Sequence, residues 1–186
     1  MNMESYIENY LNTSETVIFE TKAPMDKEQT EAFHLFHFTK RSPAIVIISF
    51  VLAGISIILC IKYLAAGETY VAVTYFIQAA IVAAIPFIMI KISVVKTSKA
   101  PYYCLNTNDF KFFEEYYVNT DLFSITVIPY NMLVSVHESE NYFFLYLTDQ
   151  QAHIIPKSSF IVNTPEEMRN FLYYKLNDRF TIHCKK

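Results

Sequence analysis

Glycine is nearly absent from this chain, since its 186 residues contain only Gly54 and Gly67. Loops that cradle phosphate groups need closely spaced glycines, because their backbone must approach the ligand and adopt positive φ angles. Neither GxGxxG nor GxxxxGK[ST] occurs, so the nucleotide-binding folds that depend on those loops are excluded. The GxSxG and HExxH patterns of hydrolases and zinc proteases are also missing.

Tryptophan is absent and cysteine is rare. Cys60, Cys104 and Cys184 lie far apart and form no CxxC pattern, so we expect free thiols. The net charge is −3, and no cluster of basic residues indicates a nucleic-acid partner. We therefore expect no nucleic-acid binding and no cofactor.

Charge is missing altogether from two long apolar runs, Pro43–Ile61 and Thr69–Ile90, which the link Lys62–Glu68 separates. As helices they would reach about 28 and 33 Å, enough to cross a hydrocarbon core of about 30 Å. The alternative is a pair of buried core helices, but scattered serine and threonine residues form no polar stripe for a soluble surface. The sequence predicts a transmembrane helical hairpin over residues 42–91, and the lipid bilayer is the first expected partner.

The flanks of the hairpin carry more positive charge than the link between its helices. By the positive-inside rule this places both termini in the cytoplasm of a multi-pass protein of the plasma membrane. The basic residues concerned are Lys40, Arg41, Lys91, Lys96 and Lys99 on the flanks and Lys62, offset by Glu68, in the link.

Gln78 is the most polar side chain within the two apolar runs. Counted from the cytosolic ends, Gln78 and Ser56 lie at similar depth, so a hydrogen bond between the two helices is expected. Two small-xxx-small pairs, Ala79/Ala83 and Ala80/Ala84, would let the helices approach closely. A contact site for a further subunit or solute is the functional alternative at Gln78 and Ser56.

Residues 1–41 are expected to form a cytosolic strand and helix. Thr16–Lys22 has the β-branched and aromatic content of a strand, which Ala23-Pro24 should end. Asp26 is a helix cap, and the helix should run to about Thr39. His34 and His37 lie three residues apart on this helix; they could bind a metal only with further ligands, and aromatic packing explains them without one.

Residues 92–186 change to short alternating segments separated by turn residues. A terminal helix follows, with Thr164 as its cap in the sequence T-P-E-E and an apolar face that should cover the sheet. Antiparallel strands closed by a helix predict an α+β roll similar to a pleckstrin-homology barrel. The predicted strands are Tyr102–Leu105, Phe110–Tyr117, Leu122–Ile128, Leu133–Glu138, Tyr142–Leu147 and Ala152–Ile155.

The segment His153–Phe160 resembles the "IIPK-x-x-F" signature of the YcxB-like proteins, and the preceding segment Leu133–Leu147 fits the same pattern. The resemblance implies a bacterial membrane protein with an N-terminal strand and helix, a two-helix hairpin and a C-terminal pleckstrin-like domain. Tyr130 departs from the family, which commonly places tryptophan there. The family carries no established activity, so the resemblance implies an architecture and no chemistry.

Lys157, in this signature, is the third candidate interaction residue beside Gln78 and Ser56. It could contact an anion or a partner, although a solvated loop lysine beside the buried Ile155 and Phe160 is the simpler interpretation.

Three functions remain open. The first is a non-enzymatic, membrane-anchored binding or scaffolding module for an unknown protein partner or for self-association. The second is an accessory subunit of a membrane transport or envelope-stress complex, contacted through Gln78. The third is an enzyme with a site around His137 and His153, although no catalytic or metal-binding motif supports it.

Overall fold

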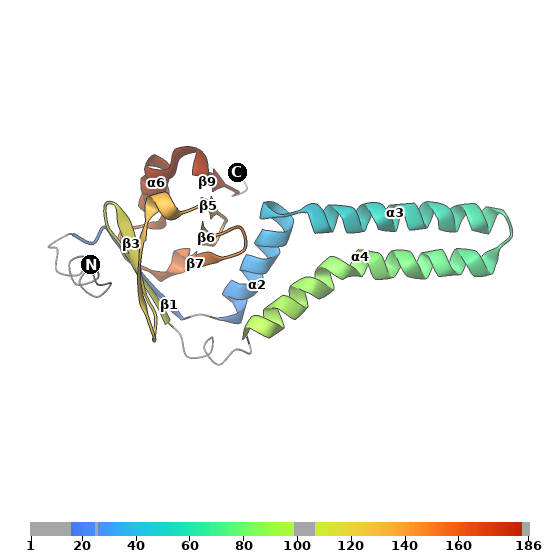
Figure 1. Cartoon of the computed structure of the whole chain (residues 1–186), viewed down its shortest axis with the longest axis horizontal. Helices are drawn as coiled ribbons and strands as arrows, with labels where there is room; N and C mark the ends of the chain where they lie inside the picture. The colour runs from blue at the N-terminus through green and yellow to red at the C-terminus, as the bar shows by residue number, and fades with distance from the viewer. Residues whose placement is uncertain (1–15, 25, 99–106, 184–186) are drawn as a thin grey trace. The chain divides into compact units, whose positions relative to one another are not determined.

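The computed structural model describes residues 16–24, 26–98 and 107–183. Contacts divide the chain into two compact units (Figure 1). Residues 1–25 and 104–186 make up the first, which we call the sheet unit, and residues 26–103 make up the second, the helical unit. The N-terminal strand therefore belongs with the C-terminal domain, from which the whole hairpin separates it in sequence.

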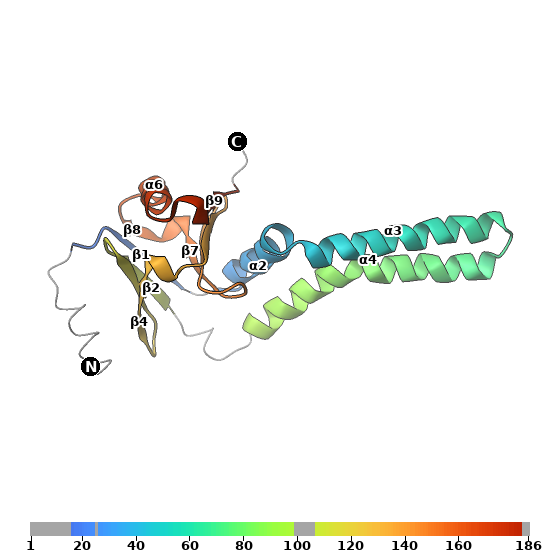
Figure 2. The same cartoon turned by 45° about the horizontal axis from the view of Figure 1, so that its top comes forward.

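The part of the sheet unit that the structure describes contains two sheets and one long helix (Figure 2). In the first sheet the strand order is β4-β3-β2-β1-β8, and in the second it is β7-β6-β5-β9. All pairs are antiparallel except β5 with β9, which run parallel. The strands are β1 (Phe19–Pro24), β2 (Thr107–Phe112), β3 (Tyr116–Thr120), β4 (Ile125–Pro129), β5 (Ser135–Glu138), β6 (Tyr142–Tyr146), β7 (Ala152–Pro156), β8 (Phe160–Val162) and β9 (Phe180–Ile182).

The strands predicted over residues 102–128 differ from the observed strands in several ways. Phe110–Tyr117 is not one strand, because residues 113–115 turn the chain between β2 and β3. Residues 107–109 and 119–120, which lie between the predicted strands or beyond their ends, belong to β2 and β3. The prediction for Tyr102–Leu105 lies outside the described residues. Strands β8 and β9 were not predicted.

Helix α6 (Pro165–Leu176) begins as its sequence predicts. The Thr164 side chain accepts from the Glu167 N–H, and the Glu167 carboxylate accepts from the Thr164 N–H, which completes a capping box. Met168, Leu172 and Leu176 are almost fully buried and place one face of the helix in the core. Most of that core is aromatic and aliphatic: Phe19, Phe110, Phe112, Tyr117, Ile128, Tyr130, Leu133, Val136, Phe143, Leu145, Ile155 and Phe180.

Tyr130 fills the position where a tryptophan was expected. It is 4% exposed, its ring contacts Tyr117 and Phe171, and its hydroxyl donates to the Phe113 carbonyl at 2.8 Å. The tyrosine ring thus packs within the apolar core, and its hydroxyl has a hydrogen-bond partner there.

The helical unit consists of α2 (Lys27–Phe36), the π-helical turn η1 (His37–Arg41), α3 (Ala44–Ala65) and α4 (Thr69–Ser98). Asp26 caps α2 by accepting from the Gln29 N–H at 2.8 Å, as predicted. Helix α4 continues past Lys91 to Ser98, because lysine is a good helix former and no helix breaker intervenes. Pro86 lies within α4, which is bent along its length (Figure 1).

Helices α3 and α4 form a hairpin that packs through small side chains. On α3 the buried residues Ser49, Ala53 and Ser56 recur at spacings of four and three, and on α4 Ala72 and Ala79 are seven apart. At the connected end the rings of Tyr63 and Tyr75 stack at 5.5 Å. Small residues at this spacing allow two helical backbones to approach closely.

Candidate functional site

The most conspicuous polar cluster in the sheet unit surrounds Glu138, at the end of β5. The carboxylate is fully buried. Glu138 shares a face with Val136, two residues earlier, and Val136 is part of the core. A carboxylate on a core-facing position requires partners, because an unpaired buried charge is strongly destabilising.

Two cations meet the Glu138 carboxylate. Arg169, on α6, donates from Nε to Oε2 at 2.7 Å and from Nη2 to Oε1 at 2.6 Å, which is the bidentate geometry of a strong ion pair. Lys157, on the 3₁₀ turn η3 (Lys157–Ser159), donates from Nζ to Oε1 at 2.5 Å. We call Glu138, Lys157 and Arg169 the ion cluster; it connects β5, η3 and α6.

The interpretation of Lys157 as a solvated loop lysine is wrong. Its side chain is 16% exposed, its Nζ lies 5.2 Å from the centre of the Phe143 ring, and its N–H donates to the Asn141 carbonyl at 2.9 Å. Pro156 ends β7, so the turn that follows directs Lys157 back towards Glu138. As expected, Ile155 is buried and Phe160 packs against the core.

Electrostatics favour the ionised form of Glu138. Burial alone would raise the pKa of this carboxyl group, but the hydrogen bonds from Arg169 and Lys157, together with their charges, outweigh burial and lower it. Both carboxylate oxygens are occupied by cations, so the group is poorly placed to exchange protons. The arrangement therefore acts as an internal connection between elements.

His137 and His153, the centre of the enzyme hypothesis, lie on opposite faces of the second sheet. His153 is in register with Leu145 and Leu145 with Val136, so these three share a face, whereas His137 follows Val136 and points the other way. The Tyr117 hydroxyl lies 3.0 Å from Nδ1 of His153. His137 Nδ1 instead lies 3.1 Å from Nε2 of His183, and Nε2 of His137 lies 3.1 Å from the Ser135 hydroxyl.

Burial affects the His153–Tyr117 pair in two ways. It lowers the pKa of His153 to about 4, although the charge of Asp121 opposes the shift, and it raises the pKa of Tyr117. At neutral pH the phenol keeps its proton and can donate it to the unprotonated Nδ1.

Glu114 and Glu115 fall within the predicted strand Phe110–Tyr117, but in the structure they belong to no strand. They lie in the β2–β3 turn, and both accept from Lys175 of α6, at 2.7 and 3.0 Å. The hydrogen bond that Lys175 donates to Glu114 raises the pKa of its ammonium group; burial opposes this shift, and the hydrogen bond donated to Glu115 adds to it. These carboxylates thus anchor the helix.

In the hairpin, Gln78 and Ser56 both belong to the part of the chain that the structure describes, and the hydrogen bond expected between them is not formed. Ser56 is buried between the helices and its hydroxyl donates to the Leu52 carbonyl, one turn earlier, at 3.0 Å. Gln78 is exposed on α4. Gln78 is exposed whereas its neighbour Ala79 is buried, so the rotation of α4 about its axis turns Gln78 out of the hairpin interface.

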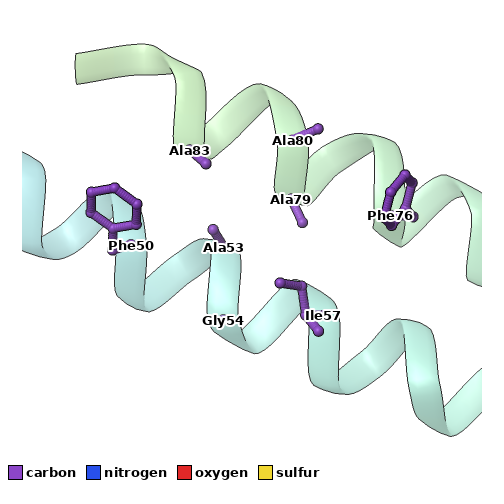
Figure 3. A pocket seen from close by; sticks show the side chains of 8 residues that line it. All are labelled: Phe50, Ala53, Gly54, Ile57, Phe76, Ala79, Ala80 and Ala83. Atoms are coloured by element: carbon purple, nitrogen blue, oxygen red, sulfur yellow. The ribbon is translucent and has the colours of Figure 1, made fainter. Parts of the chain in front are cut away.

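An apolar groove of about 350 Å³ runs along the hairpin (Figure 3). Ala53 and Ala79 point into the space between the two helices, Gly54 also lines the groove, and Phe50 and Phe76 stand at its two ends. Ala80 and Ala83, from the predicted small-residue pairs, also line it, together with Ile57.

The histidines that could have suggested a metal, His34 of α2 and His37 of η1, are involved in ring contacts. His34 contacts Phe33 at 5.4 Å and Phe38 at 6.4 Å, and His37 contacts the same two phenylalanines. Glu31 pairs with Lys91 of α4 at 2.9 Å. Among the described residues no group of three potential metal ligands lies together.

These features define a class of protein: an α+β domain with two packed sheets and a terminal helix, joined in one chain to two helices long and apolar enough to cross a membrane. Within this class, residues 112–172 match the family model described as YcxB-like protein. The match confirms the resemblance found in the sequence, and it includes Glu138, Lys157 and Arg169. No curated protein and no solved structure matched the chain.

Proposed function

We propose that this protein is a membrane-anchored binding or scaffolding module whose hairpin α3–α4 spans the plasma membrane and whose sheet unit lies in the cytoplasm. Its action is non-enzymatic, and its sheet unit is a relative of the pleckstrin-homology roll. The lipid bilayer is one partner, and an unidentified protein or a second copy of the chain is the other.

The observation that carries the membrane assignment is the exposed apolar surface of the hairpin. Helices α3 and α4 have mean hydropathies of 3.0 and 2.1. Large side chains such as Ile58, Phe76 and Ile81 are 60–67% exposed, because the two helices bury mainly small residues against each other. In water such a surface would aggregate, whereas in hydrocarbon it needs no cover.

The binding role is supported by the chemistry of the sheet unit. The buried carboxylate of Glu138 is neutralised by Arg169 and Lys157. His137 and His153, the residues of the enzyme hypothesis, lie on opposite faces of the second sheet. Rolls of this kind commonly present loops and edge strands to peptides, lipids or proteins.

Membrane fractionation tests the anchoring. We expect the full chain to stay in the membrane pellet after alkaline extraction and to enter solution only with detergent. Recovery in the aqueous fraction without detergent would contradict the proposal. Purification in a mild detergent that preserves membrane complexes should then yield a co-purifying protein or a homo-oligomer.

The alternative, an accessory subunit of a transport or envelope-stress complex, is favoured by the exposed amide side chain of Gln78 on a helix surface that is mostly apolar. Gln78→Leu should then abolish co-purification of the larger complex while membrane insertion remains unchanged. Thr74→Leu, which alters an exposed polar residue one turn away, is the matched control.

A further inference from the structure

One polar side chain on the surface of the hairpin lacks a hydrogen-bond partner among the described residues. Gln78 is exposed on α4, and its amide takes part in no hydrogen bond within that part of the chain. Thr74, one turn earlier, is also exposed, but its hydroxyl donates to the Tyr70 carbonyl at 3.1 Å. The Thr74 hydroxyl is therefore satisfied within α4, whereas the Gln78 amide is not.

Gln78 also lies far from both ends of the apolar run Thr69–Ile90. It follows Thr69 by nine residues and precedes Ile90 by twelve. At 1.5 Å per residue these separations are about 14 and 18 Å, which a glutamine side chain cannot span to reach the headgroups. In hydrocarbon an amide without a hydrogen-bond partner is strongly unfavourable. If α4 spans the bilayer, the Gln78 amide therefore requires a partner that is itself within the bilayer.

Gln78 belongs to a row of exposed side chains along α4. We call Thr74, Gln78, Ile81, Ile85 and Ile88 the Gln78 row. Its members are separated alternately by four and three residues, which is the spacing of the contact positions in a coiled coil. The three isoleucines are 60%, 39% and 53% exposed, so the hairpin leaves this row uncovered.

The Gln78 row and the buried face of α4 lie on different sides of the helix. The buried residues Ala72, Ala79 and Pro86 recur at a spacing of seven. With 3.6 residues per turn, the middle of the Gln78 row is rotated by about 140° around the helix axis from these three residues. Helix α4 can therefore pack against α3 on one side and against a further helix on the other at the same time.

We propose that the Gln78 row is an interface between two copies of this chain, in which the two Gln78 amides hydrogen-bond to each other within the bilayer. This inference rests on the proposed function and names a second copy as the partner. A carboxamide carries both N–H donors and a carbonyl acceptor, so it is complementary to itself.

Two-fold symmetry explains why a second copy meets the requirement of the amide. A copy inserted in the same direction presents an identical amide at the same depth, beside an identical row of isoleucines, and a two-fold axis places equivalent residues together. Any other protein would need a polar group at this particular depth. A polar residue within such a row also fixes the register of the two helices.

The test is disulfide cross-linking of the full chain in the membranes of cells that express it, with Cys60, Cys104 and Cys184 replaced by serine. Ile81→Cys places a thiol on the Gln78 row, one turn from Gln78. Ile55→Cys is the matched control, because Ile55 is 50% exposed on α3 and follows Pro43 by twelve residues, as Gln78 precedes Ile90. After oxidation with copper phenanthroline we expect dimers joined through position 81 and few through position 55.

Second changes in the Ile81→Cys chain test the role of the amide. Gln78→Leu should lower the ratio of dimer to monomer by about fivefold or more at equal protein-to-lipid ratio. Thr74→Leu should leave this ratio unchanged, because the Thr74 hydroxyl is satisfied within its own helix. Gln78→Leu lies on an exposed surface, so the amount of chain in the membrane pellet after alkaline extraction should not change.

The possible outcomes separate the interface from the anchoring. If the chain stays in the alkali-extracted pellet, equal cross-linking at positions 81 and 55 would overturn the inference while the anchoring stands. A dimer at position 81 that Gln78→Leu leaves unchanged would also overturn it, and so would a cross-link to a different protein in place of the dimer. Release of the chain by alkali without detergent would overturn the anchoring, and the inference with it.

Discussion

At the scale of single residues, the sheet unit contains a buried charge whose ion-pair partners are not evident from the sequence. Glu138 lies at a core-facing position, and its partners Lys157 and Arg169 are 19 and 31 residues away in sequence. The signal that could have revealed the cluster is the alternation of β5, which places Glu138 on the same side as Val136. The identity of the partners could not be predicted, because it depends on where α6 and η3 are brought by tertiary packing.

The Arg169 side chain is partly exposed, but its removal should destabilise the sheet unit more than the loss of a partly exposed side chain usually does. Arg169→Met leaves the buried carboxylate with Lys157 alone, and we expect a loss of about 3 kcal/mol in the free energy of unfolding. Urea unfolding of the full chain in detergent, followed by the near-ultraviolet circular dichroism of the tyrosines, measures this loss.

A double variant and a surface control sharpen the Arg169 prediction. Glu138→Met combined with Arg169→Met removes both charges of the bidentate pair and should cost less than the two single changes added together. Glu140→Gln, at an exposed neighbouring carboxylate, should change stability by no more than about 0.5 kcal/mol. A loss below about 1 kcal/mol for Arg169→Met would show that the ion pair contributes little.

His153 gives a second prediction, on pH. Its pKa is about 4 in the folded protein, from an ordinary value of 6.5, so between these values the unfolded chain binds a proton that the folded chain does not. Stability should then fall as the pH decreases from 6.5 to 4, by about 3 kcal/mol. His153→Asn should lack this loss, while the loss linked to the lowered pKa of Glu138 begins only near and below the ordinary carboxyl range. Urea midpoints measured across that pH range distinguish the two; the same slope in both proteins would contradict the assignment to His153.

At the scale of elements, the sequence predicted those features that depend on hydrogen bonds between residues close together in the chain. Asp26 and Thr164 cap helices through hydrogen bonds within three residues, so both helix starts could be found in the sequence. The β2–β3 turn was missed because Phe113-Glu114-Glu115 contains none of the usual turn residues. Strands β8 and β9 have three residues each and exist only because distant β1 and β5 pair with them.

The hairpin interface allows a prediction with a closely matched control. Ala79 is 5% exposed and packs against α3, whereas its neighbour Ala80 is exposed. Ala79→Leu should force the helices apart and destabilise the hairpin by about 1–3 kcal/mol, and Ala80→Leu should have a much smaller effect. Denaturation of the full chain in mixed micelles of mild detergent and dodecyl sulfate, followed by far-ultraviolet circular dichroism, compares them. Equal losses would show that α4 packs through a different face.

At the scale of the whole molecule, the sequence predicted the two long helices. It did not predict that the N-terminal strand pairs with the domain that follows these helices in the chain. Strand β1 lies between β2 and β8 in the first sheet, so the sheet is complete only after the hairpin has been made. This pairing of β1 with β2 could not be read from local pattern, because it closes a loop of more than eighty residues.

Because both ends of the hairpin run into the same sheet unit, β1 before α3 and β2 after α4 must lie on one side of any membrane that the hairpin crosses. Together with the basic flanks Lys40, Arg41 and Lys91, this makes the cytoplasm the expected side. In a chain without its native cysteines, Glu68→Cys in the α3–α4 connection should react with a membrane-impermeant maleimide added to intact cells. Gln150→Cys in the sheet unit should react only after the membrane is permeabilised. Reaction at position 150 in intact cells would place the sheet unit outside, and reaction at neither position after permeabilisation would mean that the reagent does not report topology here.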